Sequence, residues 1–194
     1  MPKNLPITPK QLVVNISSVK KEKTGKVTIR KKDLILPTSV RVLDMLYLPD
    51  KKYKLLLVAT SDGYVRGWKS TQNGIVLATQ PDNEEEPFEH HFGVEIYSLA
   101  WDSINEVLYC GQKNGGILMW NLKTDLEKTL TEGQEDEGEE KANRLITCMI
   151  TMPKLQFMAS GRMDGKLLLW DTINSKKKWT YREHARGILS VAFN

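Results

Sequence analysis

The sequence predicts an all-β fold made of repeated four-stranded sheets, and three observations lead to this prediction. The pair Asp-Gly or Asn-Gly occurs at positions 62–63, 114–115 and 164–165. A tryptophan follows each of these glycines by five residues, as Trp68, Trp120 and Trp170. The unit recurs at an interval of about 50 residues, and a fixed interval of that size is the signature of a repeat architecture.

Each repeat contains four short apolar segments that read as strands. Asp-Gly or Asn-Gly between two apolar runs predicts a hairpin, because a type I′ turn needs positive φ at both central residues. A strand therefore ends near Ser61, Gln112 and Met163, and the next one carries the tryptophan. Another strand precedes each pair, at Val42–Leu48, Val94–Trp101 and Leu145–Met152. A fourth follows, at Gly74–Thr79, Leu126–Leu130 and Lys178–Arg182. Four strands per unit is the outline of a propeller blade.

The flanks continue the pattern on both sides. Residues 12–38 predict the last two strands of a preceding blade, at 12–16 and 26–30 with a turn at 20–25, after an N-terminal arm at 1–11. Residues 187–194 repeat the pattern of residues 95–102 and predict the first strand of a further blade. The predicted units are therefore blades at 39–82, 83–132 and 133–182, with an acidic loop at 132–141, followed by a strand within 183–194.

These spaced units resemble the WD40-repeat β-propeller family. The resemblance implies a structural tetrad in each blade: a histidine, a serine or threonine, the turn aspartate and the tryptophan. Carried onto this chain, the third unit offers Ser160, Asp164 and Trp170, with the family's signature aspartate as Asp171. The second offers His91 (or His90), Asn114 and Trp120, with Cys110 in the serine position. The first offers Asp62 and Trp68, and His184 would serve the next unit. No tetrad is complete, so apolar packing should stabilise these blades.

Three blades with fragments on both sides form an arc rather than a closed ring. An open arc exposes an apolar blade face at each end, which favours aggregation. We therefore expect these residues to be part of a larger propeller. Either further sequence or another chain would complete the ring.

Composition places the chain among soluble globular proteins, with 28 basic and 24 acidic residues and a net charge of +4. The longest apolar run, Leu55–Ala59, is far shorter than the roughly 20 residues that cross a bilayer. No apolar signal segment follows Met1. Cys110 and Cys148 are too few for a disulfide framework, so we expect reduced thiols and a cytoplasmic location.

The sequence shows no catalytic motif. It contains no glycine-rich phosphate loop, no Gly-x-Ser-x-Gly and no Cys-x-x-Cys, so we expect no enzyme activity, cofactor or small-molecule substrate. His90 and His91 beside acidic residues could suggest a metal site, but neighbouring strand residues point to opposite faces. One tetrad histidine and one solvated histidine is the favoured interpretation. Trp101 and Trp179 read as core or blade-packing residues.

Charge is unevenly distributed along the predicted loops. Acidic residues fill two predicted connections between blades: Glu84, Glu85 and Glu86, then Glu135, Asp136, Glu137, Glu139 and Glu140. Lysines fill the predicted turns between third and fourth strands, on the opposite face: Lys20, Lys21, Lys23, Lys69, Lys123, Lys176, Lys177 and Lys178. This arrangement predicts either a polar molecule whose basic face binds an acidic partner, such as tubulin, or merely solvated loops.

The leading functional hypothesis is a non-enzymatic scaffold that binds several proteins in one assembly. The irregular repeats, with first strands ending in Leu48-Pro49 and Met152-Pro153, are similar to those of large ciliary WD-repeat proteins, which implies a cilium or microtubule-associated role. The alternative is a WD40 subunit of an RNA-containing, ribosome-assembly type particle. It would use the lysine-rich face, with phosphate contacts that weaken as salt rises.

Overall fold

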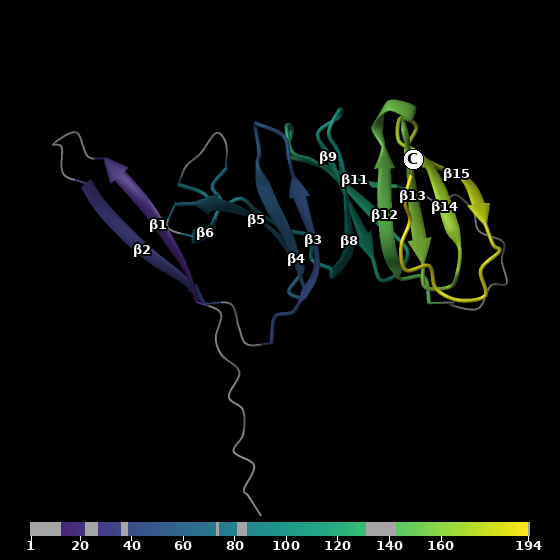
Figure 1. The fold of residues 1–194 in the computed structure, drawn as a ribbon, viewed down its shortest axis with the longest axis horizontal. Coiled ribbons are helices and arrows are strands. Elements are labelled where there is room, and N and C mark those ends of the chain that lie inside the picture. Colours follow the sequence, from purple (N-terminus) through teal and green to yellow (C-terminus); the bar gives the residue numbers. More distant parts are fainter. Residues whose placement is uncertain are drawn as a thin grey trace, which may run out of the picture.

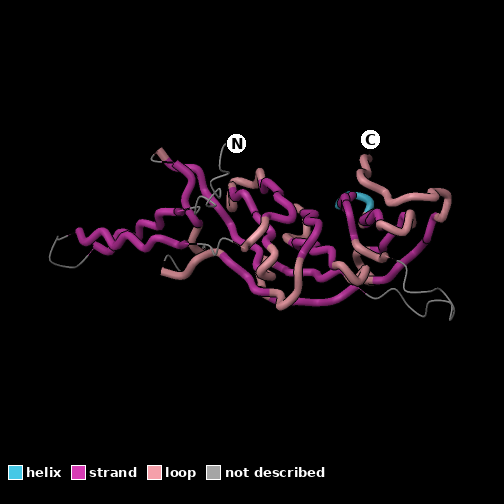
Figure 2. The backbone as a smooth tube through the Cα atoms, turned by 90° about the horizontal axis from the view of Figure 1, so that it is seen from below, coloured by secondary structure: helices cyan, strands magenta, loops and turns pink. Residues whose placement is uncertain are grey.

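The three predicted blades are present as three antiparallel sheets that stand side by side along the long axis of the molecule (Figures 1 and 2). The computed structural model describes residues 13–21, 27–35, 39–72, 74–80, 85–130 and 143–193. Regular structure in these ranges is strand, apart from one 3₁₀ helix, η1 (Pro153–Leu155). None of the described helical structure is long or apolar enough to cross a membrane.

In each blade, successive strands of the chain pair side by side, and the first strand lies at the inner edge of the sheet. The first contains β3 (Val42–Leu48), β4 (Leu55–Thr60), β5 (Tyr64–Thr71), β6 (Gly74–Leu77) and β7 (Glu89–His91). The second contains β8 (Ile96–Asp102), β9 (Val107–Gln112), β10 (Ile117–Asn121) and β11 (Leu126–Leu130). The third contains β12 (Ile146–Met152), β13 (Phe157–Arg162), β14 (Leu167–Asp171) and β15 (Lys176–Tyr181). The prediction of an all-β blade architecture is thus confirmed, with most strand bounds within two residues.

The turns between the second and third strands differ from the predicted type. Gly63, Gly115 and Gly165 have φ of +82°, +89° and +82°. The residue before each glycine is not among the positive-φ residues, so a type I′ turn is excluded. In the first blade the Gly63 N–H donates to the Thr60 carbonyl at 3.0 Å, as in a type I turn that ends on a left-handed glycine. The Asp-Gly pair therefore suits this three-residue loop as well as the two-residue type I′ turn that was predicted.

The hydrophobic core lies between the blades. Strand alternation sends Leu57 and Ala59 toward the second blade, where they join Leu108 and Trp120 in one buried cluster. A second cluster joins the second and third blades, through Tyr109, Ile117, Met158 and Trp170. Trp120 and Trp170 therefore each face the preceding blade. The third cluster, Trp68 with Leu77, lies on the side of the first blade that points away from the second.

The outermost strand of the first blade is split in two, which corrects the predicted blade boundary at 82/83. β6 pairs with the second half of β5 and β7 with its first half. Between β6 and β7 the chain leaves the edge of the sheet through residues 78–80 and comes back to it through residues 85–88. We call these two described segments the edge excursion. Its described ends are joined by a bridge between Thr79 and Pro87. The first blade therefore extends to His91, and the connection to the second blade is 92–95.

The two flanks fit the repeat only in part. β1 (Val13–Lys21) and β2 (Val27–Ile35) pair as the predicted hairpin, and β1 contacts β6 at the end of the row (Figure 1). Their assignment to a preceding blade stays a prediction. Residues 187–193 are not a strand, contrary to prediction. The Ile188 N–H donates to the Arg162 carbonyl of the third blade, but no described segment supplies the ladder that a strand requires.

Candidate interaction surface

In the third blade, the predicted serine–tryptophan contact of the tetrad is present. The Trp170 Nε1–H donates to Ser160 Oγ at 2.8 Å, and both side chains are buried. The turn aspartate of this blade pairs with an arginine instead of a histidine. Arg162 Nη2 lies 2.8 Å from Asp164 Oδ2, and the Arg162 side chain is almost wholly buried. A cation from the second strand thus replaces the tetrad histidine.

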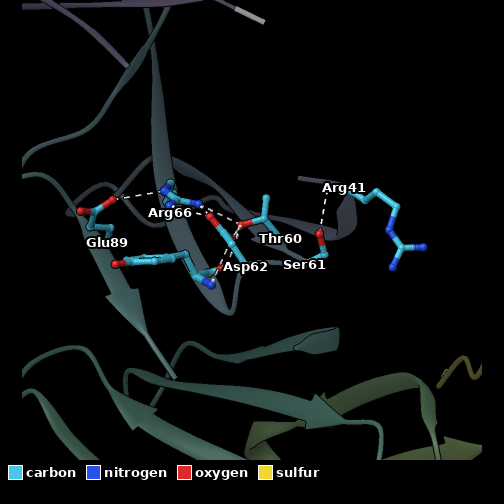
Figure 3. Close-up of polar contacts among 7 residues, drawn as sticks. Arg41, Thr60, Ser61, Asp62, Arg66 and Glu89 are labelled. Atoms are coloured by element: carbon cyan, nitrogen blue, oxygen red, sulfur yellow. Dashed lines mark hydrogen bonds and ion pairs between the residues drawn. The ribbon is translucent and has the colours of Figure 1, made fainter. Parts of the chain in front are cut away.

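The first blade also uses an arginine, but from its third strand. Figure 3 shows Arg66 lying between Glu89 on one side and Asp62 and Thr60 on the other. Arg66 Nη2 lies 3.0 Å from Asp62 Oδ2, and Nε lies 3.2 Å from Glu89 Oε2. The guanidinium also packs 4.1 Å from the centre of the Tyr64 ring. Arg66 is only 6% exposed, so breaking these pairs would leave a buried charge.

This cluster controls the ionisation of Asp62. Partial burial alone would raise the pKa of the Asp62 carboxyl, but hydrogen bonds from Arg66 and Thr60 outweigh it and lower the pKa below 3.8. Asp62 therefore stays ionised under ordinary conditions. Because Glu89 follows the edge excursion in sequence, the same arginine also fastens β7 to the blade.

In the second blade the predicted tetrad is not assembled. His91 stacks on Tyr64 of the first blade, with ring centres 4.4 Å apart, and so does not reach Trp120. The neighbouring His90 stacks on Trp120 at 4.5 Å and lies 2.6 Å from Glu127 Oε1. Of the two histidines that the sequence offered for this role, His90 therefore lies against Trp120 and His91 lies against the first blade, because β7 pairs with β5.

The remaining members of that tetrad make local contacts. Trp120 Nε1–H donates to Asp125 Oδ1 at 2.7 Å, since Cys110 offers no strong acceptor. Asn114 Oδ1 accepts the Gly116 N–H at 2.9 Å within its own turn. Asp171 likewise accepts the N–H groups of Ile173 and Asn174, and His184 is exposed. These residues shape turns rather than a shared network.

The predicted basic face is only partly assembled. Lys123 lies in a turn between third and fourth strands, as predicted. Lys69 lies in β5, and Lys176, Lys177 and Lys178 begin the edge strand β15. Lys20 and Lys21 end strand β1, and Lys23 lies outside the described residues. Lysines on an edge strand block unwanted strand pairing, which is a sufficient reason for the run at 176–178.

The acidic segments also separate. Glu85 and Glu86 are exposed on the edge excursion, at the outer margin of the first blade, instead of in a loop between blades. The prediction failed because Phe88, only 2% exposed, pulls the returning chain back onto β5. Glu84, Glu135, Asp136, Glu137, Glu139 and Glu140 lie outside the described residues. Their part in a charged face stays a prediction.

Polar contacts between the inner strands fix neighbouring blades to one another. Asp44 of β3 accepts the Leu99 N–H of β8 at 2.6 Å, and burial raises the pKa of its carboxyl. The Trp101 Nε1–H donates to Asp50 Oδ2 at 2.7 Å, so the predicted blade-packing role of Trp101 is confirmed. Thr151 of the third blade donates to the Trp101 carbonyl at 2.5 Å. The three sheets therefore form a stiff frame.

Large apolar side chains are exposed on both outer faces of the row of blades. Trp179, predicted as a core or blade-packing residue, is 50% exposed on β15, beside an exposed Tyr181. At the opposite end of the row, Met45 and Tyr47 are exposed on the face of β3 that points away from the second blade. Both faces agree with the expectation that an arc leaves apolar ends open.

A further apolar surface lies on the turns between first and second strands. A hollow of about 300 Å³ opens between the turn at 103–106 and η1. Its lining includes Ile104, Met152, Pro153, Lys154, Leu155 and Phe193, and we call it the turn groove. Sequence reasoning missed this site and the Arg66 cluster. The sequence signal for the groove was an aliphatic residue within each of two otherwise polar turns, Ile104 in one and Leu155 in the other.

The described residues hold no group of three or more histidine, cysteine, aspartate or glutamate side chains that could bind a metal ion. Cys110 is fully buried, and burial raises its pKa well above 9.0.

Comparison with protein sequences finds a relative that matches nearly the whole chain. It is 56% identical over 192 residues, or 99% of this chain, to the cilia- and flagella-associated protein 337 B of Tetrahymena thermophila. The chain spans 15% of the length of that relative. A shorter segment is 35% identical over 60 residues to the mouse WD repeat-containing protein 75, covering 29% of this chain and 7% of that protein.

Family and structure comparisons agree with the repeat pattern. The family model described as WD domain, G-beta repeat, matches residues 136–171. A chain in the crystal structure of the mitotic checkpoint complex superposes with a TM-score of 0.60 at 16% identity, covering 94% of this chain and 49% of that one. The structure of U3-55K gives 0.52 at 14% identity, covering 76% and 43%. At these identities the likeness concerns the fold.

Proposed function

We infer that this chain binds other proteins as a rigid scaffold. The inference starts from the premise that the chain belongs to the WD40-repeat β-propeller family. The observation that carries this inference is the set of contacts between blades at Asp44–Leu99, Asp50–Trp101 and Trp101–Thr151. They hold the blades in one arrangement while the turns stay exposed. Loops on a rigid frame are where such folds keep their function.

We place this scaffold in a cilium or flagellum, in a protein assembly on the microtubules. Support comes from the Tetrahymena relative, whose name places it in cilia and flagella and which matches 99% of this chain at 56% identity. Within such an assembly, Lys123, Lys176 and Lys178 are exposed and suit an acidic partner such as a tubulin tail. Binding, and not catalysis, is the activity we assign.

Fractionation tests the ciliary assignment. The full-length protein carries a fluorescent tag in a ciliated cell, and isolated cilia are extracted first with detergent and then with salt or a chaotrope. We expect the tag in the cilium, retained after detergent and released by the second step. The Gly165→Val variant, which breaks the third blade, should lose retention. A tag that stays in the cell body, or leaves with detergent, contradicts the proposal.

One observation favours a second candidate, binding of single-stranded RNA. Trp179 and Tyr181 are both exposed on β15, and Lys178 Nζ lies 5.9 Å from the centre of the Trp179 ring. Exposed aromatic rings beside lysines can stack bases. Binding of an RNA oligonucleotide that weakens steeply with salt and falls in Trp179→Ala would support this candidate. Absence of binding at low salt would remove it.

A further inference from the structure

The turn groove is a preformed surface. In its first wall, the buried carboxylate of Asp102 accepts the Ile104 N–H at 2.9 Å. The Leu122 N–H donates to the Glu106 carbonyl at 2.9 Å, and this bond ties the turn to the next one along the blade. In the second wall, the Thr172 N–H donates to the Gln156 carbonyl at 3.0 Å. Both turns are thus fixed before any partner arrives, which lowers the entropic cost of binding.

The two walls also have a fixed separation. Thr151 stands two residues before η1, and its hydroxyl donates to the Trp101 carbonyl of the second blade at 2.5 Å. The groove therefore crosses a junction between blades whose members are hydrogen bonded to each other. Its width is a property of the frame and not of loose loops.

The lining is apolar and open to solvent. Ile104 is 60% exposed, Leu155 52% and Phe193 54%. All three are large side chains gathered around one hollow. Exposed apolar groups that cluster in a concave, polar-rimmed surface mark an interaction site, because burial of such groups in a complex is favourable.

The groove carries a single type of charge. Lys154 is the one charged residue among its lining residues, all of which the structure describes. Lys154 is exposed and has no hydrogen bond or ion pair with any described residue. By contrast, Lys52 in the corresponding turn of the first blade lies 2.8 Å from Glu106 Oε2 and is neutralised. The groove therefore complements a negative charge.

We propose that the turn groove binds a short acidic segment of a partner protein, with one large apolar side chain in the hollow and a carboxylate on Lys154. The proposal rests on the scaffold function and names the chemistry of one partner. A protein segment fits better than a nucleic acid, because aliphatic side chains dominate the lining whereas base stacking uses aromatic platforms. A hollow of about 300 Å³ accommodates a side chain or two, at the lower end of ligand-sized sites.

Peptide selection on the full-length protein tests the proposal. A phage library of random peptides is first depleted on the Ile104→Asp/Leu155→Asp double variant and then selected on the wild type. Both positions are more than half exposed, so the double variant should fold. We expect enriched peptides with acidic residues next to an aromatic or aliphatic residue. Their affinity should fall about tenfold or more in Leu155→Asp and in Lys154→Glu.

The matched control is Ile75→Asp on β6. Ile75 is 65% exposed and lies outside the groove, so this variant should bind the selected peptides as the wild type does. The proposal is overturned if no peptide is enriched over the depleted pool, or if the enriched peptides lack acidic residues. It is also overturned if a labelled polyuridine RNA binds and loses affinity in Lys154→Glu but not in Leu155→Asp.

The peptide selection and the ciliary fractionation test the two proposals independently. Retention of the tagged protein in cilia without peptide binding would defeat the groove proposal alone. Peptide binding without ciliary retention would defeat the ciliary assignment and leave the groove as the docking site of a scaffold elsewhere.

Discussion

The Phe88 ring occupies the space into which a side chain at position 67 would extend. A Cβ atom built on Gly67 would come within 2.7 Å of Phe88 Cδ1. The two residues also share a backbone hydrogen bond, from the Gly67 N–H to the Phe88 carbonyl at 2.8 Å. Gly67 thus lets the chain that returns from the edge excursion enter the core between the first two blades.

Gly67→Ala should destabilise the fold by about 1–3 kcal/mol, because the added methyl displaces a packed ring. Equilibrium denaturation measures this free energy of unfolding. In a Phe88→Ala background the same change should cost much less, since the ring is gone and the two sites are coupled. Equal costs in both backgrounds would mean that the alanine acts through another contact.

Trp170→Ala should lower the free energy of unfolding by about 3–5 kcal/mol, because the indole is fully buried and bonded to Ser160. Trp179→Ala is the matched control. Trp179 is half exposed, so its loss should change stability by about 0.5 kcal/mol or less. Similar losses in the two variants would contradict the assignment of Trp170 as a core residue of the third blade.

Gly165→Val should prevent folding of the third blade for two reasons. The residue has φ of +82°, and a Cβ there would collide with the carbonyl oxygens of His184 and Arg186. Gly93→Val separates the two effects, because Gly93 has φ of +70° but nothing within 4 Å of its Cβ position. We expect a loss of about 1–2 kcal/mol from backbone strain in Gly93→Val. Circular dichroism and thermal melting should show a larger loss for Gly165→Val.

Asp62→Asn should reduce stability most above pH 3.8. Arg66 and Thr60 hold the pKa of the folded carboxyl below 3.8, against the effect of burial. The stabilisation is therefore complete above the unfolded pKa and is lost as the pH falls through the folded one. Denaturation of both proteins across acidic pH should give curves that converge at low pH.

Asp44→Asn should show the opposite trend. Burial raises the pKa of Asp44 above 3.8, although N–H groups of Leu99 and Met45 partly offset this. Ionisation then costs the wild type stability as the pH rises, so the variant should gain relative to the wild type over that range. Parallel curves would show that Asp44 does not titrate differently in the folded state.

The sequence predicted the blades because their strands, turns and tryptophans repeat at one interval. Leu126–Leu130 was predicted to the residue, since polar turn residues bound a short run there. The split outer strand was not predicted, because nothing in the sequence distinguishes Phe88 from other apolar residues near acidic loops. Only the structure shows that its ring packs over Gly67. The exchange of His91 for His90 follows from that split, as the side on which β7 pairs decides which histidine faces the second blade.

The site was less predictable than the fold for a physical reason. Arg66 and Arg162 take the place of tetrad histidines from different strands, so no fixed spacing announces them. The turn groove combines residues some fifty positions apart that only the stacking of blades brings together. The runs of lysine and of acidic residues, by contrast, are visible in the sequence. The sequence does not show whether such a run lies in a turn or on an edge strand, as the lysines at 176–178 do.

The edge excursion offers a practical attachment point. Its neck is closed by the Thr79–Pro87 bridge and by the Gln80 N–H, which donates to the Glu86 carbonyl at 2.9 Å. Sequence inserted beyond this neck adds length without moving the register of β5, β6 or β7. An epitope or a small fluorescent reporter inserted between Gln80 and Glu85 would therefore be joined to the molecule at this neck, away from the turn groove.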